Sequence, residues 1–181
     1  MLKTIKTPIP FSKASKIAKS DKFDYSKDVS NKKSIEDLPD KIKSKVYQFQ
    51  KEGIQYGLQK FGRMLLGDEM GVGKTVQAIG IAYLFKNDWP LLIIAPASLK
   101  FTWRDELLNW LPSLRPHDIQ LFKKGNEPIN RDCCIFIMSY DLATKRYIDL
   151  QQYDFNAIIA DEAHFLKSRD SKRSKNLIPI L

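Results

Sequence analysis

The sequence predicts an α/β fold with a largely parallel central sheet. Short apolar runs of strand type alternate with longer segments of helical periodicity. These runs are residues 64–66, 91–95, 119–122, 135–138 and 157–160. The runs 91–95 and 157–160 are apolar throughout, which is typical of parallel strands buried on both faces. Strands separated by helices favour a layered α/β sandwich.

Length and charge divide the chain into an arm and one domain. The chain has 181 residues, of which 43% are hydrophobic, enough for one packed core and an extension. Much of the net charge of +9 lies near the N-terminus, where residues 1–45 hold 12 lysines against six acids. We expect a basic, mostly flexible arm over 1–38 and a domain over 39–181. A solvated linker, a nucleic-acid-binding arm and a nuclear import signal remain open for the arm.

Cysteines and apolar segments bear on the class of protein. Cys133 and Cys134 are adjacent and have no partner elsewhere, so we expect neither a disulfide framework nor a zinc site. No apolar run approaches the roughly 20 residues of a membrane helix. No apolar stretch of a signal peptide follows Met1. We therefore expect a soluble protein of a reducing compartment that is neither secreted nor bound to a membrane.

Residues 40–61 predict one helix packed on the core. Its apolar residues recur at near-helical spacing, at Val46, Phe49, Ile54, Leu58 and Phe61. Gln50 lies in this segment, and its amide offers the donor and the acceptor that reading an adenine edge requires. Taken alone, however, Gln50 is more typical of a surface glutamine.

Residues 67–75, GDEMGVGKT, form a glycine loop between a predicted strand and a helix that opens at Thr75. Gly71 and Gly73 can adopt positive φ, so the backbone N–H groups can surround an anion. Lys74 offers charge to the β- and γ-phosphates, and Thr75 offers a hydroxyl to a phosphate-bound Mg²⁺. The pattern G-x-x-x-x-G-K-[ST] has glycine where this chain has Asp68. The alternative is a strand-to-helix turn without a ligand.

We take eight residues of the glycine loop as candidate nucleotide contacts. They are Asp68, Glu69, Met70, Gly71, Val72, Gly73, Lys74 and Thr75. The helix after the next strand is predicted to begin at a Ser98 cap. Its residues Leu99, Trp103, Leu107 and Trp110 recur at helical spacing, which favours core positions for the two tryptophans.

Two acids follow the last predicted strand. Asp161 and Glu162 come directly after the run 157–160, 87 residues downstream of Lys74. In a parallel sheet this strand would lie beside the strand of the glycine loop, with its carboxyl end at the same crevice. Asp161 would then hold Mg²⁺, and Glu162 would act as general base toward the attacking water. A solvated turn is the alternative.

A basic stretch follows these acids. Residues 167–175 hold five basic residues and one acid. Clustered cations can bind a nucleic-acid backbone through counterion release. A solvated helical face remains an equal alternative.

Several stretches together resemble the first ATPase lobe of the Swi/Snf helicase-like superfamily, superfamily 2. The stretches that carry the resemblance are 49–54, 68–79, 89–96 and 161–167. The phrase Phe101-Thr102-Trp103 through residues 110–114 narrows it to the annealing-helicase branch. The resemblance covers residues 38–181, implies a RecA-like P-loop NTPase sandwich, and explains Asp68, since the superfamily tolerates a residue other than glycine there.

The resemblance implies ATP and Mg²⁺ as cofactors. Gln50 resembles the glutamine that reads adenine. Lys74 and Thr75 resemble the residues that bind phosphate and Mg²⁺. Asp161 and Glu162 resemble the hydrolytic pair.

Other positions are implied to communicate with DNA and with a second lobe. His164 resembles the nucleotide-site residue that links the γ-phosphate state to the other lobe. Segments 96–100 and 139–140 resemble two motifs that track the DNA backbone. The implied partner is duplex or branched DNA, and the implied location is the nucleus, otherwise the cytoplasm.

The sequence departs from the family at its end. The family continues with a Ser/Thr-Gly-Thr motif and a second lobe that carries arginine fingers, so we expect a fragment that hydrolyses ATP poorly alone. Two alternatives remain for its function. One is a non-catalytic module that binds DNA or a partner, and the other is an RNA-directed helicase lobe, which Phe101-Thr102-Trp103 disfavours. The oligomeric state has no sequence signal.

Overall fold

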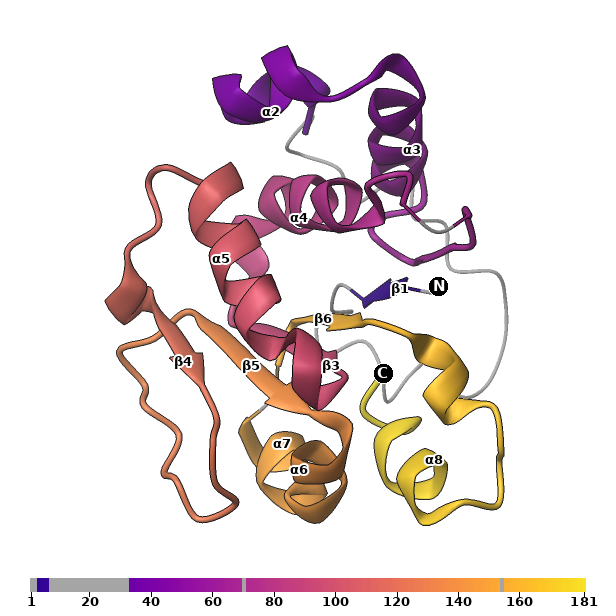
Figure 1. Ribbon diagram of the computed structural model, residues 1–181, viewed down its shortest axis with the longest axis vertical. Helices are drawn as coiled ribbons and strands as arrows, with labels where there is room; N and C mark the ends of the chain where they lie inside the picture. The colour runs from indigo at the N-terminus through magenta and orange to yellow at the C-terminus, as the bar shows by residue number, and fades with distance from the viewer. Residues whose placement is uncertain (1–2, 7–32, 70, 154) are drawn as a thin grey trace, which may run out of the picture.

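The computed structural model describes residues 3–6, 33–69, 71–153 and 155–181, in which helices cover both faces of one sheet (Figure 1). The sheet has six strands in the order β2-β1-β6-β3-β5-β4. Their bounds are β1 (Lys3–Lys6), β2 (Met64–Leu66), β3 (Leu91–Ala95), β4 (Ile119–Leu121), β5 (Ile135–Ser139) and β6 (Ala157–Ala160). The predicted α/β sandwich is confirmed, and each of the five predicted strands is present.

The helices form one layer on each face of the sheet. One layer holds α2 (Asp40–Lys45), α3 (Gln48–Gln59), α4 (Lys74–Leu84) and α5 (Lys100–Trp110). The other holds α6 (Tyr140–Lys145), α7 (Tyr147–Tyr153) and α8 (Lys172–Leu177). Short 3₁₀ turns are η2 (Ile35–Asp37), η3 (Lys86–Asp88), η4 (Ala97–Leu99), η5 (Pro116–Asp118) and η6 (Ala163–Leu166). No helix among the described residues is long and apolar enough to cross a membrane.

The sheet is parallel except for β1. Strand β3 pairs in parallel with β5 and β6, and β4 pairs in parallel with β5, whereas β1 is antiparallel to both β2 and β6. The expectation that β6 lies beside β2 is therefore wrong, because β1 separates them. Thr4 lies opposite Leu65 on one side and Ala160 on the other, so β2 and β6 end level with each other. Two strand spacings put these ends about 10 Å apart.

The predicted arm also needs a correction at its ends. Lys3–Lys6 belongs to the sheet, and Leu38 is buried in the core, so neither fits a flexible arm. Pairing with β2 and β6 holds Lys3–Lys6 in the sheet, whereas burial of its apolar side chain holds Leu38 in the core. Residues 7–32 lie outside the described residues, and for them the arm stays a prediction.

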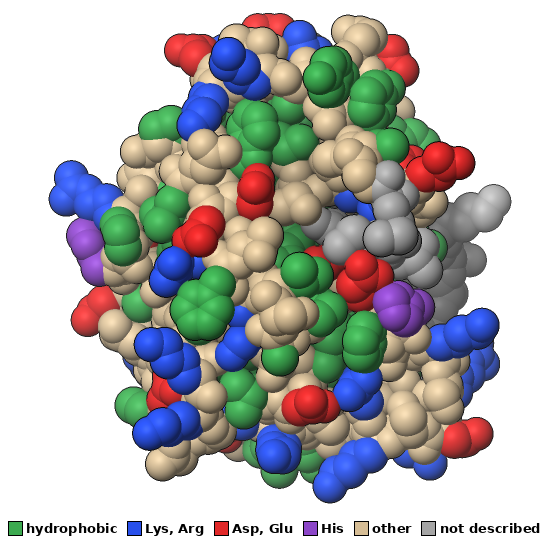
Figure 2. All heavy atoms as spheres, viewed as in Figure 1, with side chains coloured by type: hydrophobic (Ala, Val, Ile, Leu, Met, Phe, Trp, Pro, Cys, Tyr) green, Lys and Arg blue, Asp and Glu red, His purple; other side chains and the backbone are tan. Residues whose placement is uncertain are grey.

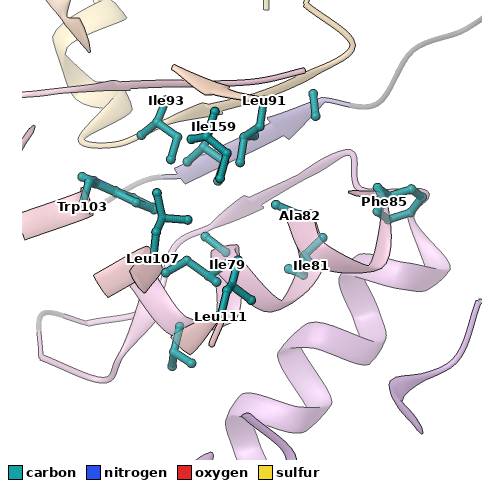
Figure 3. Close-up of a cluster of buried hydrophobic side chains, with 14 of the residues drawn as sticks. Ile79, Ile81, Ala82, Phe85, Leu91, Ile93, Trp103, Leu107, Leu111 and Ile159 are labelled. Atoms are coloured by element: carbon teal, nitrogen blue, oxygen red, sulfur yellow. The ribbon is translucent and has the colours of Figure 1, made fainter. Parts of the chain in front are cut away.

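Two hydrophobic clusters fill the space between the sheet and its helices. Along β3, Leu91 and Ile93 belong to the first cluster, and Leu92 and Ile94 belong to the second. This alternation follows from the two-residue period of a strand. In Figure 3, Trp103 lies among the apolar side chains of the first cluster, which α4 and α5 cover. The apolar residues of β3 thus pack alternately into the two hydrophobic clusters.

The single helix expected over 40–61 is two helices. Val46 and Tyr47 are extended, with ψ of 142° and 162°, and they separate α2 from α3. The Tyr47 N–H bonds the Gln50 Oε1 at 2.9 Å, which stabilises the start of α3. Phe49, expected on the apolar face, is 48% exposed as a result.

The expected start of α5 was also wrong, and the connection from β5 to β6 was not predicted. Leu99, not Ser98, precedes the first residue of α5, and no side chain caps that helix because the turn η4 leads directly into it. Helices α6 and α7 connect β5 to β6, where the sequence predicted no element. Their short lengths leave little helical periodicity to detect.

Candidate nucleotide site and basic groove

The glycine loop has the backbone that its glycines predict. Gly71 and Gly73 have φ of +84° and +76°. A Cβ on Gly73 would lie 2.3 Å from the Gln50 Nε2, while the Cβ position of Gly71 is open. Among the described non-glycine residues only Phe61 and Glu162 have positive φ, so Asp68 needs no glycine conformation. The departure from the sequence pattern therefore introduces no backbone strain.

Lys74 is held inside the glycine loop. Its side chain is 3% exposed, and its ammonium donates to the backbone carbonyls of Asp68, at 2.6 Å, and Glu69. Gly73 precedes Lys74 as the N-cap of α4, so the loop ends at the positive end of an 11-residue helix. An ammonium, backbone N–H groups and a helix N-terminus converge here, which is an arrangement suited to phosphate.

A hollow of about 490 Å³ lies beside the loop. Its lining includes Gln50, Gly73 and Thr75, together with Thr102 and Trp110 of α5. The amide of Gln50 donates to the Val72 carbonyl at 2.9 Å and accepts the Tyr47 N–H. An amide carries two donor hydrogens and two acceptor lone pairs, so Gln50 keeps one of each for a ligand in the hollow.

Asp161 is the most buried acid of the candidate site, at 1% exposure. Trp103 Nε1 donates to its Oδ2 at 2.8 Å, and the Glu162 N–H donates to its Oδ1 at 3.0 Å. The Tyr140 hydroxyl donates to the Asp161 carbonyl at 2.7 Å. Burial raises the pKa of Tyr140, and the charge of Asp161 adds to this effect, so the phenol stays a donor.

Glu162 has the left-handed backbone of a strained position, with φ of +54° and ψ of +49°. Its Oε2 lies 3.1 Å from the Nδ1 of His164. The His164 ring is half exposed and stands 4.9 Å from the ring of Phe165. The turn after β6 thus presents one carboxylate and one imidazole next to the buried Asp161.

The structure brings the predicted residues to one edge of the sheet. The glycine loop leaves β2 and Asp161 leaves β6, and these two strands end at the same level. Gln50 of α3 contacts the glycine loop at this edge through the Val72 carbonyl. Met70 lies outside the described residues, and Val72 contributes its carbonyl to Gln50.

Sequence reasoning missed the support that four residues give this edge. Gln77 of α4 is 1% exposed and donates to the Asp68 Oδ2 at 3.3 Å. A Cβ on Gly53 would lie 2.0 Å from the Gln77 Oε1, so glycine lets α3 approach α4 here. Trp103 and Tyr140 hold Asp161 from segments 58 and 21 residues away. Only Gln77 had a signal in the sequence, because it is a polar residue inside a largely apolar helix.

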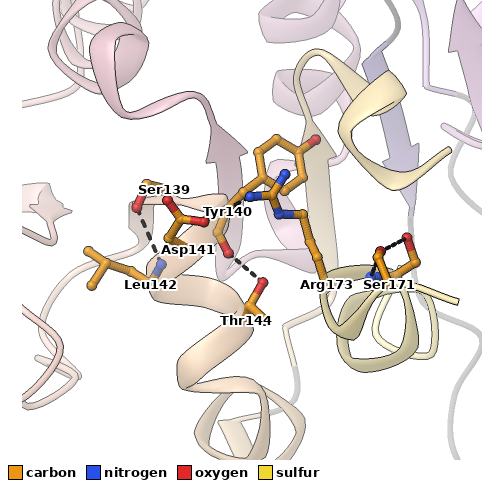
Figure 4. Close-up of polar contacts among 8 residues, drawn as sticks. Ser139, Tyr140, Asp141, Leu142, Thr144, Ser171 and Arg173 are labelled. Carbon is orange, nitrogen blue, oxygen red and sulfur yellow. Dashed lines mark hydrogen bonds and ion pairs between the residues drawn. The ribbon is translucent and has the colours of Figure 1, made fainter. Parts of the chain in front are cut away.

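A second hollow, the α6–α8 groove, lies between α6, η6 and α8. Four basic residues line it together with one acid, and they are Lys145, Lys167, Lys172, Arg173 and Asp141. Arg173 bonds the Asp141 Oδ1 at 2.8 Å and lies over the rings of Tyr140 and Phe165. Figure 4 shows Arg173 reaching from α8 to Tyr140 at the start of α6. Lys and Arg side chains are frequent on this lower part of the face in Figure 2.

Three residues of the two segments expected to track DNA are buried, whereas Ala97 and Ser98 of the segment 96–100 are exposed. Ser139 is 7% exposed and its hydroxyl accepts the Leu142 N–H at the start of α6, while Tyr140 is 2% exposed. In the segment 96–100, the Lys100 ammonium turns inward to the Phe122 carbonyl at 2.5 Å. Direct contact with a nucleic acid through Ser139, Tyr140 or Lys100 is therefore not available in this conformation.

Comparison with known proteins gives relatives over most of this chain. The family model described as SNF2-related domain matches residues 49–180. The Bos taurus protein "DNA annealing helicase and endonuclease ZRANB3" is 42% identical over 155 residues, which are 82% of this chain and 14% of that protein. The Xenopus tropicalis protein "SWI/SNF-related matrix-associated actin-dependent regulator of chromatin subfamily A-like protein 1" is 39% identical over 148 residues, 81% of this chain and 15% of that protein.

A solved structure supports the same assignment. The "Sulfolobus solfataricus SWI2/SNF2 ATPase core in complex with dsDNA" matches with a TM-score of 0.63 and 28% identity, over 73% of this chain and 29% of that chain. The present chain thus spans 14% to 15% of the length of the two relatives above. These similarities confirm the predicted resemblance and the RecA-like fold. The chain belongs to the SNF2-related domain family.

Proposed function

We propose that this chain is the ATP-binding lobe of a DNA-dependent ATPase that translocates on DNA or anneals it. One observation carries the proposal: the glycine loop and Asp161 leave two parallel strands at the same edge of the sheet, about 10 Å apart. A triphosphate with its metal can span that distance. The relatives named as annealing helicases support the choice of DNA as partner.

In this proposal each polar group has one task. Lys74 and the loop N–H groups bind the β- and γ-phosphates, and Thr75 and Asp161 hold Mg²⁺. Bound Mg²⁺ offsets negative charge on the phosphate oxygens. Glu162 accepts a proton from the attacking water, and His164 fixes the Glu162 carboxylate through their 3.1 Å contact. Gln50 reads the adenine edge with its remaining donor and acceptor.

The α6–α8 groove is the proposed contact for one phosphate backbone of duplex or branched DNA. Its exposed lysines, Lys145, Lys167 and Lys172, suit phosphate contacts that need no fixed geometry. The transition-state charge requires arginines of a second lobe, so the longer protein is the proposed enzyme. Nuclear location is proposed from the chromatin role in the name of one relative.

The test compares nucleotide binding and ATPase activity. The present chain is titrated with a fluorescent ADP analogue in Mg²⁺, and a longer protein carrying the second lobe is assayed for ATP hydrolysis with and without branched duplex DNA. We expect Lys74→Ala to weaken nucleotide binding and abolish hydrolysis, and exposed Lys60→Ala to change neither.

Three results would overturn the proposal. Hydrolysis that DNA does not stimulate would contradict a DNA-dependent motor. Stimulation by duplex RNA above duplex DNA would favour the RNA-directed alternative. A steep salt dependence of DNA binding with no hydrolysis in the longer protein would favour the non-catalytic module.

A further inference from the structure

The Trp103 side chain and the Glu162 backbone both donate hydrogen bonds to the carboxylate of Asp161. Trp103 Nε1 bonds Oδ2 at 2.8 Å, and the Glu162 N–H bonds Oδ1 at 3.0 Å. A carboxylate offers about four lone-pair sites, which is more than these two hydrogen bonds use. A neutral donor orients the group without cancelling its charge, unlike a lysine or an arginine.

Trp103 is well placed to fix the direction of that carboxylate. Its side chain is 2% exposed and lies in the first hydrophobic cluster with Leu107 and Ile93 (Figure 3). Close packing of a rigid ring allows the indole little rotation. The N–H therefore points from the apolar core to Asp161, a partner 58 residues away in the sequence.

The backbone of Asp161 is fixed as well. The Tyr140 hydroxyl bonds its carbonyl at 2.7 Å, and the Asp161 N–H bonds the Ile94 carbonyl at 2.8 Å. With the main chain held, the remaining freedom of the residue is rotation of its carboxylate. The bond from Trp103 restricts that rotation.

We propose that Trp103 is a positioning residue for the Mg²⁺-holding carboxylate of Asp161, an inference that rests on the proposed function. The indole N–H holds Oδ2 from the side of the apolar core, while the Glu162 N–H holds Oδ1. Loss of the indole N–H leaves the carboxylate charged but removes the bond that holds Oδ2. Mg²⁺ affinity then falls, while binding of nucleotide without metal does not.

The test removes the N–H in two ways. Trp103→Phe deletes the donor and part of the ring. Replacement of Trp103 by 3-benzothienylalanine exchanges the N–H for sulfur at nearly constant volume, so folding is preserved if the smaller ring of Trp103→Phe is not tolerated. Trp89→Phe is the matched control, because the Trp89 Nε1 donates to the Ala82 carbonyl away from this edge.

Binding of a fluorescent ADP analogue to the present chain is titrated with Mg²⁺ and repeated in EDTA. We expect both Trp103 changes to raise the Mg²⁺ concentration at half-saturation about 10- to 100-fold, the usual cost of losing a group that orients a metal ligand. Affinity in EDTA and all values for Trp89→Phe should stay within about twofold of the wild type, a margin of about 0.4 kcal/mol.

Asp161→Asn distinguishes failure of this inference from failure of the proposed function. If Asp161→Asn raises the Mg²⁺ requirement and the Trp103 changes do not, Trp103 has no positioning role and the proposed function stands. If the wild type shows no Mg²⁺-dependent binding, or Asp161→Asn leaves it unchanged, both proposals fail. An equal loss with and without Mg²⁺ in the benzothienylalanine protein would identify Trp103 as a structural residue only.

Discussion

The nucleotide edge and the α6–α8 groove differ in how the protein holds their charged groups. Lys74 and Asp161 are 3% and 1% exposed and are bonded to the backbone or to buried side chains. The groove instead presents lysines such as Lys167 and Lys172 on the exposed surface. The first arrangement is preorganised for one small ligand, whereas the second can follow a polymer of variable shape.

This difference predicts two kinds of response to mutation. Changes at the nucleotide edge should depend on geometry and respond little to salt, because buried charges are weakly screened. Changes in the groove should be small individually and strongly salt-dependent.

Lys74→Ala should weaken binding of Mg²⁺·ADP by about 10- to 100-fold, since a charge-assisted hydrogen bond contributes about 1.5–3 kcal/mol. Isothermal titration calorimetry at 50 and 300 mM KCl would measure this. The exposed Lys60→Ala is the control. If the loss of ADP affinity disappears at 300 mM KCl, Lys74 responds to salt as the groove lysines are expected to. The proposed difference between the two regions would then be wrong.

Gly73→Ala should destabilise the chain by about 2 kcal/mol, because alanine at φ of +76° is strained and its Cβ meets Gln50. Gly71→Ala has similar strain with open space around the Cβ, so about 1 kcal/mol is expected. Urea unfolding would measure both. Equal losses would show that the contact between Gly73 and Gln50 yields without cost.

Replacing Lys167 and Lys172 with glutamine removes both positive charges. This change should weaken duplex DNA binding and leave ADP binding unchanged. Each DNA phosphate that the groove no longer neutralises should lower the slope of log K against log salt by about 0.9 in magnitude. Fluorescence anisotropy across a salt series measures that slope, with Lys60→Gln as the matched charge control. An unchanged slope would remove the groove from the DNA-binding surface.

Tyr140→Phe should cost about 1 kcal/mol at neutral pH, because the Asp161 carbonyl loses its donor. Burial raises the pKa of Tyr140 above 10. The stability from this neutral phenol is therefore present below pH 10 and is lost as pH rises through the folded-state pKa. The gap in Tm between wild type and Tyr140→Phe should shrink above pH 10.

The local features of the nucleotide edge were predictable, whereas its supports were not. Residues 71–75 encode their own geometry, since glycines at positive φ and a following helix are short-range properties. The bond from Trp103 to Asp161 joins positions 58 apart, which no local pattern reports. Periodicity assigned Trp103 to the core correctly but could not say where its N–H points.

Much of the sheet was likewise predictable from apolar runs, but its strand order was not. The continuous apolar runs at Leu91–Ala95 and Ala157–Ala160 predicted strands buried on both faces, and both strands are fully buried in the structure. Lys3–Lys6 has the composition of a solvated segment, and only pairing with two distant strands makes it β1. At Val46 and Tyr47, apolar spacing suggested a continuous helix although the backbone is extended.

The central claim is that the glycine loop and the acid pair share one metal–nucleotide site. Paramagnetic broadening by Mn²⁺·ADP in the ¹⁵N-labelled chain tests it directly. We predict that the amide signals of Thr75, Asp161 and Glu162 broaden together at substoichiometric Mn²⁺, while that of Lys172 stays sharp. Broadening at Thr75 without Asp161 and Glu162 would contradict the account.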